Sequence, residues 1–228
     1  MIDVINREEV LRYLGYNGQE ISDHINKIID ICREETINKS NPKYIYSYFN
    51  IELLNNEIHV CNTNLILRGN DIKEQLKECK QIAIMVVTLG LEIERFININ
   101  EKINLTKAII LDSCATTYVE AICDKVENKI KDEMLEKGFN TNSRYSPGYG
   151  DFPLDIQGEL LALISSEKRI GVTISRQHLL FPRKSVTAII GIGNKEVKSK
   201  ERDCSKCIMY NSCNFKKGGK SCGYKGIK

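Results

Sequence analysis

The longest helical pattern in the chain covers residues 105–137 and constrains the fold more than any other segment. Gly138 follows it directly, and glycine is a common helix terminator. The first half of the segment is apolar and rich in small residues, whereas the second half is charged. We therefore expect a single long helix with one end buried in the protein and the other end facing water.

Shorter elements surround this helix. Helical patterns cover residues 7–14, 20–37, 71–80 and 154–167, and a further short helix is predicted to begin at Leu91. Asp71 is expected to cap its helix. Strand patterns cover residues 44–54 and 57–61, which form a predicted hairpin, and residues 82–88, 171–175 and 185–192. Because helices and strands do not alternate regularly, we expect an α+β fold with a mixed, mainly antiparallel twisted sheet and flanking helices.

A change of composition divides the chain into a predicted domain of residues 1–194 and a tail of residues 195–228. The tail holds ten Lys and Arg against three Asp and Glu, so its local charge is +7, and residues 1–194 sum to −4. An acidic body with a basic tail is weak evidence for nucleic-acid binding, which usually uses a basic patch on the folded domain. No apolar stretch approaches the roughly 18 residues of a membrane span, and the first residues are charged, so a cytoplasmic location is expected.

The nine cysteines form two groups. Five lie in apolar segments, where a free cysteine packs as a small hydrophobic residue: Cys32, Cys61, Cys79, Cys114 and Cys123. Four lie in the tail: Cys204, Cys207, Cys213 and Cys222. Four thiolates suit tetrahedral zinc or an iron–sulfur cluster, although their spacing is that of neither a zinc ribbon nor a bacterial ferredoxin. The sequence alone leaves three states open for the four tail cysteines: bound to zinc, bound to an iron–sulfur cluster, or free thiols.

Residues 140–153 form a predicted loop of defined shape, since they contain Pro147-Gly148, Gly150 and Pro153. The guanidinium of Arg144 suits a ligand carboxylate because it offers paired donors in a planar fork. Tyr149 can supply a flat face or a hydroxyl to an adenosine. From the residues alone, a ligand pocket and a purely structural turn both remain open. No catalytic dyad stands out in the sequence.

The ordered string Arg144-x-x-Pro147-Gly148-Tyr149, with Pro153 four residues later, resembles the signature of the activation domain of cobalamin-dependent methionine synthase. Residues 171–174 and 181–187 are similar to the family's next motif, which ends in P-x-x-S-V. Residues 12–16 and 88–90 are similar to segments of its free-standing, single-domain members. The resemblance extends over about residues 5–193.

This resemblance implies a fold and a function. The family binds S-adenosylmethionine, so Arg144 would hold the methionyl carboxylate, and Pro147, Gly148 and Tyr149 would form the turn that lines the cofactor. Glu120 would lie near the ligand ammonium, or else be an ordinary solvated helix residue. The chain would be the activation subunit of a methyltransferase system in methionine biosynthesis. It would support reductive methylation of cob(II)alamin on a partner methionine synthase, with an electron from flavodoxin, ferredoxin or a cluster in the tail.

The chain departs from the family directly after the second proline of the signature. After its second proline the family usually continues with Asp-His-Thr-Glu, whereas this chain reads Leu154-Asp155-Ile156-Gln157, so Asp155 and Gln157 are the candidate substitutes for a corrinoid contact. The chain is alternatively a reactivator or electron-relay module for another corrinoid methyltransferase. The second rival is a zinc-tailed binding protein without methyl transfer, for which nucleic acid is the ligand to test.

Overall fold

A six-stranded antiparallel sheet forms the centre of the protein in a computed structural model that describes residues 4–16, 18–55, 57–194 and 197. The strand order is β3-β2-β1-β4-β8-β5. The strands are β1 (Lys43–Leu54), β2 (Glu57–Val60), β3 (Ile66–Leu67), β4 (Cys79–Thr88), β5 (Asn140–Thr141) and β8 (Ser185–Gly193). This architecture confirms the predicted α+β class with an antiparallel sheet and flanking helices.

The central strand β4 has helices on both of its faces. Alternate residues of a strand point to opposite faces of the sheet. Ala83, Met85 and Val87 accordingly join one hydrophobic cluster, and Ile82, Ile84 and Val86 join another. Because both faces are covered, nearly the whole of β4 is apolar, which is why its sequence shows a continuous run rather than an alternation.

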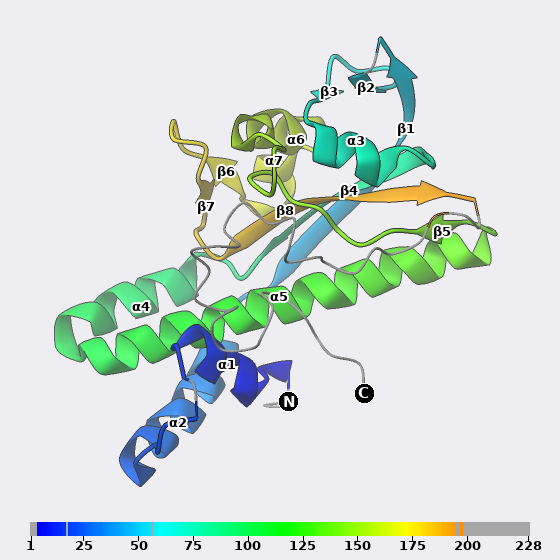
Figure 1. Cartoon of the computed structure of the whole chain (residues 1–228). Coiled ribbons are helices and arrows are strands. Elements are labelled where there is room, and N and C mark those ends of the chain that lie inside the picture. Colours follow the sequence, from blue (N-terminus) through cyan, green and yellow to red (C-terminus); the bar gives the residue numbers. More distant parts are fainter. Residues whose placement is uncertain (1–3, 17, 56, 195–196, 198–228) are drawn as a thin grey trace.

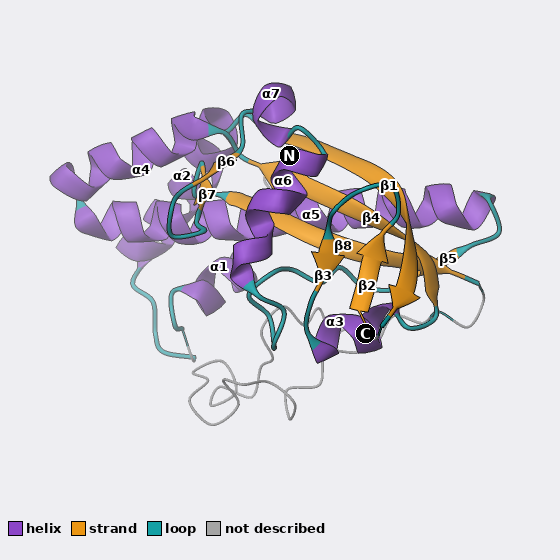
Figure 2. Ribbon diagram, turned by 90° about the horizontal axis from the view of Figure 1, so that it is seen from above, coloured by secondary structure: helices purple, strands orange, loops and turns teal. Residues whose placement is uncertain are grey.

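The first cluster lies between the sheet and a layer of helices dominated by α5 (Figure 1). This layer contains α1 (Arg7–Tyr13), α2 (Asp23–Lys39), α4 (Leu91–Ile103) and α5 (Leu105–Glu136). The second cluster lies on the opposite face of the sheet, beneath α3 (Asn70–Leu76), the 3-10 turn η2 (Leu154–Ile156), α6 (Gln157–Leu163) and α7 (Ser166–Ile170). A small hairpin of β6 (Thr173–Ile174) and β7 (Leu180–Phe181) extends from that layer. Figure 2 shows the sheet extended over α5, with α4 at the left of the view and α3 at the bottom.

The long helix α5 confirms the predicted helical segment, but its charged half is more buried than expected. The Asn104 side chain accepts a hydrogen bond from the amide of Lys107 and caps the helix. A buried stripe continues through Val126 and Ile130 to Met134. Near this end, both carboxylate oxygens of Glu133 accept hydrogen bonds from tyrosine hydroxyls of β1, at 2.6 Å and 2.7 Å. The sequence pattern did not reveal these contacts because β1 lies about 85 residues before Glu133 in the chain.

Two other predicted helices have different ends. The predicted helix 71–80 ends at Leu76, since Cys79 already pairs with Gly193 in the sheet. The predicted helix 154–167 is broken into η2, α6 and α7, and Ser165 adopts a left-handed conformation at the second break. Ser166 follows that break, is buried, and donates a hydrogen bond to the carbonyl oxygen of Val172 at 2.8 Å. Tertiary contacts therefore override the local helical preference at both places.

Four of the five dispersed cysteines pack as predicted. Cys32, Cys79, Cys114 and Cys123 are buried, whereas Cys61 is only half-buried and follows β2 in a turn, so core packing was wrong for Cys61. Burial raises the pKa of the Cys79 thiol to about 11 and that of Cys32 to about 12. These thiols are neutral near pH 7, as expected of packing residues.

The division of the chain at residue 194 stays a prediction, because almost all of the tail, including its four cysteines, lies outside the described residues. Within the described residues, no helix combines the length and the apolar character that crossing a bilayer requires.

Candidate functional site

The loop that carries the signature is anchored at its start to the central sheet. Tyr145 and Ile189 exchange two backbone hydrogen bonds of 2.8 Å each, so the chain next to Arg144 is held against β8. Just before it, the Asn142 side chain accepts from the amide of Gly191 at 2.7 Å and donates to the carbonyl of Gln75 at 2.7 Å. The loop therefore leaves the sheet from a fixed point.

The proline–glycine bend is a rigid turn with an exposed tip. Pro147 is buried, whereas Gly148, Tyr149 and Gly150 are exposed. The amide of Gly148 donates to the carbonyl of Phe152 at 2.8 Å, and the amide of Phe152 donates to the carbonyl of Tyr149 at 3.0 Å. Gly148 has φ +88°, a left-handed conformation that glycine adopts without strain.

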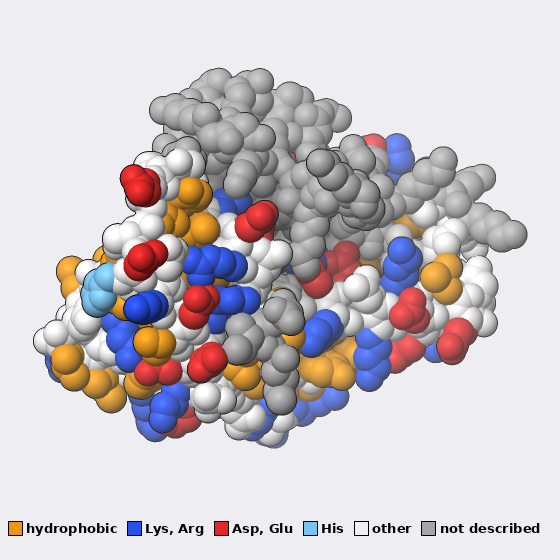
Figure 3. Space-filling model, turned by 90° about the horizontal axis from the view of Figure 1, so that it is seen from below, with side chains coloured by type: hydrophobic (Ala, Val, Ile, Leu, Met, Phe, Trp, Pro, Cys, Tyr) orange, Lys and Arg blue, Asp and Glu red, His pale blue; other side chains and the backbone are white. Residues whose placement is uncertain are grey.

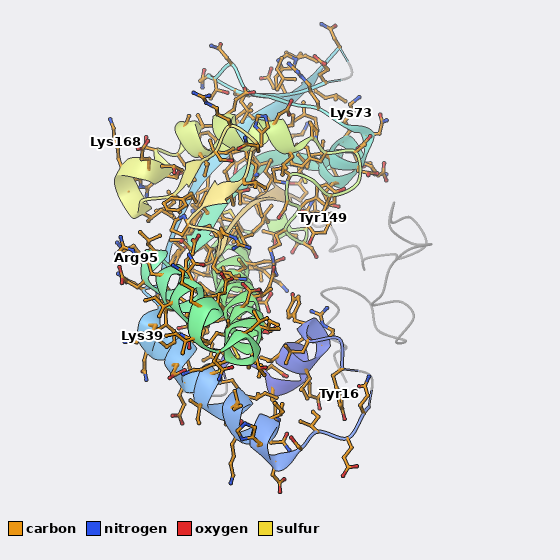
Figure 4. The ribbon with its side chains drawn as sticks, turned by 90° about the vertical axis from the view of Figure 1, so that its left-hand side faces the viewer. Tyr16, Lys39, Lys73, Arg95, Tyr149 and Lys168 are labelled. Carbon is orange, nitrogen blue, oxygen red and sulfur yellow. The ribbon has the colours of Figure 1, made fainter. Side chains whose placement is uncertain are left out.

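Aromatic side chains hold the two ends of this turn together. Phe152 is 1% exposed and belongs to the hydrophobic cluster beneath α3 and α6. The ring of Tyr145 packs between those of Phe152 and Tyr149, at centroid distances of 6.1 Å and 6.3 Å. Tyr149 itself is 48% exposed. Figure 4 shows it at the edge of the described molecule, between the level of Lys73 above and that of Tyr16 below.

A reciprocal pair of carboxylates clamps the loop to α3. Both oxygens of Asp151 accept backbone amides at the start of the helix, from Asn70 at 2.7 Å and from Asp71 at 2.9 Å. The Asp71 carboxylate in turn accepts the amide of Asp151 at 3.1 Å. Gly69, at the N-cap position, has no side chain for this purpose. Asp71 was therefore wrongly predicted as the cap, since Asp151 performs that role from the loop.

The clamp also fits closely around Gly150. A Cβ atom at this position would overlap with Asp71 Oδ2 and would lie 2.7 Å from the Tyr145 hydroxyl. That hydroxyl donates to the carbonyl of Tyr149 at 3.1 Å. Burial, followed by the charges of Asp71 and Asp151, raises the pKa of Tyr145 to about 12, so the phenol keeps the proton that it donates.

Replacing Asp151 with alanine should destabilise the protein by about 1 kcal/mol at pH 7, the usual cost of losing a helix cap. Backbone hydrogen bonds from Asp71 and Asn70 lower the pKa of Asp151 below its ordinary value. A depressed pKa contributes stability that is present above the unfolded-state value, near 4, and is lost as the pH falls through the folded-state value. Urea unfolding at pH 7 and in strong acid should therefore show the difference between wild type and variant shrinking on acidification. Asp155→Ala, on the exposed side of η2, is the matched control, and an equal loss for both variants would contradict the clamp.

The guanidinium of Arg144 lies against three carboxylates of α5. Its Nη2 donates to Glu120 at 2.8 Å, and its Nη1 donates to Asp124 at 2.8 Å and also to Glu127. Residues three and four apart lie on one face of a helix, so Glu120, Asp124 and Glu127 form one acidic stripe toward the loop. The Arg144 side chain is 12% exposed, and those of Glu120, Asp124 and Glu127 are 42%, 28% and 20% exposed.

This group of residues carries an excess of negative charge. Burial lowers the pKa of Arg144, but attraction to Glu127 and Glu120 outweighs it, and the pKa lies above its ordinary value. The guanidinium is therefore always charged. Figure 3 shows acidic and basic side chains interspersed over the described part of one face of the molecule.

The structure thus joins two of the predicted site residues and places the other three at the adjoining turn. Arg144 and Glu120 form a direct ion pair, so Glu120 is not a purely solvated helix residue. Pro147 supports the turn from inside, while Gly148 and Tyr149 form its exposed tip. Asp124, Glu127 and Asp151 were missed, and Asp71 was predicted only as a helix cap. The spacing of Asp124 and Glu127 from Glu120 along a predicted helix was a usable signal for two of them.

The side chain of Gln157 makes two internal hydrogen bonds that its position in the sequence did not indicate. Its side chain is 5% exposed, donates to the carbonyl of His178 at 2.7 Å and accepts from the hydroxyl of Thr187 at 2.8 Å. Since both ends of the amide are used inside the protein, Gln157 is poorly placed to contact a corrinoid. Asp155 is exposed.

No metal-binding group stands out in the part of the chain that the structure describes. Among those residues, no set of three or more His, Cys, Asp and Glu side chains is arranged to hold an ion. Cys204, Cys207, Cys213 and Cys222 lie outside them, so the predicted metal site stays a prediction.

Comparison with known proteins adds one finding. No family model and no curated protein matches the chain. A solved crystal structure of the MetH reactivation domain bound to AdoHcy is similar to it, with a TM-score of 0.61 and 14% sequence identity over 87% of this chain and 73% of that one. The chain therefore has the fold of the MetH reactivation domain, as the resemblance of its loop implied.

Proposed function

We propose that this chain binds S-adenosylmethionine and supports the reductive methylation of cob(II)alamin on a partner cobalamin-dependent methionine synthase. The observation that carries the proposal is the position of Arg144. On a fold shared with a domain solved with AdoHcy, its guanidinium lies against an acidic stripe of α5, and the Pro147–Gly148 turn follows it directly in the chain. AdoHcy and S-adenosylmethionine differ only by the transferable methyl group and its charge.

The residues present fit the chemical groups of this ligand. The ligand carboxylate suits the planar fork of Arg144, and its ammonium suits the carboxylate of Glu120. The half-exposed ring of Tyr149 offers a face for adenine, and Gly148 allows the backbone to approach the ligand closely. Pro147 and the Asp151 clamp hold this turn in place.

The chain's contribution to the reaction is binding and orientation. S-adenosylmethionine would supply the methyl group to the partner's corrinoid once an external donor such as flavodoxin or ferredoxin has reduced the corrinoid by one electron, and AdoHcy would be released. Holding the donor methyl in a fixed position lowers the entropic part of the barrier. No proton has to be removed in such a transfer, so the site requires no general base.

Exposed apolar side chains of η2 and of the β6–β7 hairpin support a docking partner. Leu154 is 38% exposed, Leu179 is 61% exposed and Phe181 is 46% exposed. The hydrogen bond between Gln157 and the carbonyl of His178 ties η2 and α6 to the hairpin that carries the last two. Apolar side chains left exposed beside a polar site are typical of interaction surfaces.

The proposal is tested by following methyl transfer. A cobalamin-loaded methionine synthase core in the cob(II) form is mixed with this protein, titanium(III) citrate and S-adenosylmethionine carrying a labelled methyl group. Label should reach the corrinoid, and the cob(II)alamin absorbance should decay, faster than without the protein. Equal rates with and without the protein would contradict the proposal.

We propose separately that the tail cysteines hold a metal, because four thiolates in one short segment suit zinc or an iron–sulfur cluster. A cluster would offer the chain its own electron relay. Elemental analysis and visible absorbance of the anaerobically purified protein distinguish the two metals. Zinc without visible absorbance would remove the relay, and absence of both zinc and iron would remove the metal site.

A further inference from the structure

We infer that two copies of this chain associate through the first half of β1, which pairs with itself about a twofold axis at Tyr46. The association is independent of the proposed ligand and lies on a different part of the molecule. Three observations carry it: an open edge of the central sheet, the uncharged residues along that edge, and the charges that accompany its tyrosines.

The first half of β1 is paired on one side only. Residues 43–50 pair with β4, whereas β2 begins its pairing on the other side at Ile51. Figure 2 shows β1, β4 and β8 side by side in this order. Among the residues that the structure describes, no strand pairs with the outer side of residues 43–49. An open edge of this kind offers its backbone donors and acceptors to any strand that approaches.

Two hydrogen bonds at the ends of this segment show which residues face the open side. The carbonyl of Asn50 accepts the amide of Cys61, at 2.9 Å, on the β2 side. The amide of Asn41 donates to the carbonyl of Leu89, at 2.8 Å, on the β4 side. The N–H and C=O of one residue point the same way, and the direction alternates along the strand. Both bonds therefore give the same outward residues, which are three tyrosines: Tyr44, Tyr46 and Tyr48.

This edge lacks the features that usually keep an edge strand single. Those features are charges, proline and bulges. No charged residue, proline or glycine occurs between Lys43 and Glu52, and the pairing with β4 shows no register shift there. Tyr44 is 42% exposed, and Tyr46 and Tyr48 are half-buried, whereas β4 is buried from its fourth residue onward. A flat, uncharged edge is thus left open to another strand.

A second copy fits this edge in one antiparallel register. With Tyr46 opposite Tyr46 of the second copy, Tyr44 lies opposite Tyr48 of the second copy. The outward backbone groups of all three tyrosines are then satisfied, because opposed outward residues exchange both hydrogen bonds. An axis at Ser47 would instead need the carbonyl of Asn50, which already accepts a hydrogen bond within its own chain. The fold therefore selects the axis at Tyr46.

The charges beside the tyrosines are complementary in this register. Lys129 of α5 lies over the rings of Tyr44 and Tyr46, at 5.6 Å and 5.7 Å. Glu133 accepts the hydroxyls of Tyr46 and Tyr48. Since Tyr44 lies opposite Tyr48 of the second copy, the Lys129 end of one row meets the Glu133 end of the other, and symmetry repeats the match. Cross-strand aromatic and opposite-charge pairs both stabilise a sheet.

The basic tail of the chain is a poorer occupant of the same edge. Residues 195–228 carry a local charge of +7. Lys43 begins the strand, Lys129 lies over Tyr44, and Lys137 lies over Tyr48 at 5.5 Å. Like charges repel, whereas a second copy brings a carboxylate to meet a lysine.

Tyr44→Pro tests the pairing. Proline removes the outward N–H, and it is tolerated in an edge strand where that N–H faces solvent, so the monomer should keep the circular dichroism of wild type. Tyr44→Val is the matched control, because it removes the same ring and keeps the N–H. The dimer dissociation constant of Tyr44→Pro should be about tenfold above that of Tyr44→Val, since one hydrogen bond is lost from each copy. Sedimentation equilibrium of the full chain, with a reductant present, measures both constants.

Hydrogen exchange of the wild type tests the register without any variant. The amide of Tyr46 faces the open edge, so it should exchange more slowly at high than at low protein concentration. The amide of Ser47 faces β4 and should be protected equally at both concentrations. Amide-resolved NMR measures the two rates.

Three results would overturn the association. The first is a wild type that stays monomeric throughout the micromolar range, which would leave the edge to a different protein. The second is a dimer with equal dissociation constants for Tyr44→Pro and Tyr44→Val, and the third is exchange at Tyr46 that does not depend on concentration. Each result leaves the binding of S-adenosylmethionine untouched, so the proposed function stands or fails separately.

Discussion

Arg144→Ala is expected to lower the free energy of unfolding by about 3 kcal/mol, because removing one partner of a buried ion pair leaves the others uncompensated. In wild type the guanidinium lies between Glu120, Asp124 and Glu127, and its side chain is 12% exposed. Without it, three carboxylates would repel one another along a single face of α5. Urea unfolding followed by circular dichroism measures the loss.

Arg144→Lys separates charge from geometry. An ammonium restores the positive charge but lacks the planar fork, so it cannot reproduce contacts to three carboxylates. We expect an unfolding free energy between those of wild type and Arg144→Ala. Acidification should recover part of the stability of Arg144→Ala, since protonation removes the repulsion. A loss of less than about 0.5 kcal/mol for Arg144→Ala, the scale of an ordinary surface change, would contradict the arrangement.

Phe152→Ala is expected to cost about 3–4 kcal/mol, the usual range for truncating a fully buried phenylalanine. Its side chain is 1% exposed and is among the largest fully buried ones in the described chain. Phe152 also ends the turn, since its carbonyl accepts the amide of Gly148 and its amide donates to Tyr149. The same variant should therefore loosen the turn that carries the exposed tip. Thermal unfolding and proteolysis within the loop measure the two effects.

Phe152→Leu is the matched variant, because leucine keeps most of the apolar volume. It should cost roughly 1 kcal/mol, in line with a core substitution that nearly conserves volume, and should leave the loop resistant to protease. Leu154→Ala, two residues along and 38% exposed, should change stability little. Similar stabilities for Phe152→Ala and Leu154→Ala would show that the loop is not anchored in the core.

The elements that the sequence predicted well are those whose signals are local. The apolar run of β4 and the long pattern of α5 each identify their element without knowledge of its neighbours. The loop could be located because proline fixes its own backbone angle and glycine permits angles that other residues avoid. Arg144 and Glu120 were identified as site residues through a resemblance. In the structure, Nη2 of Arg144 lies 2.8 Å from Oε2 of Glu120.

The features that were missed depend on contacts between distant segments. Asp151 caps a helix that begins about 80 residues earlier, so no pattern near either residue indicates the clamp. The end of α3 is set by the pairing of Cys79 with Gly193, and the break before α7 accompanies a buried hydrogen bond from Ser166. From its local sequence Gln157 resembles a surface helix residue. Its side chain is hydrogen-bonded inside the protein because the fold places His178 and Thr187 beside it.

The proposed function depends most directly on whether the pure protein binds S-adenosylmethionine. Titration calorimetry should give one site per chain with a dissociation constant on the micromolar scale, and Arg144→Ala should weaken it by about tenfold or more, as expected for a lost charge-assisted contact. The Arg95→Ala variant, which also removes one positive charge, from a side chain that is 62% exposed and paired with Glu92, controls for the change of charge. No detectable binding to wild type, both alone and together with a corrinoid-loaded partner, would contradict the account.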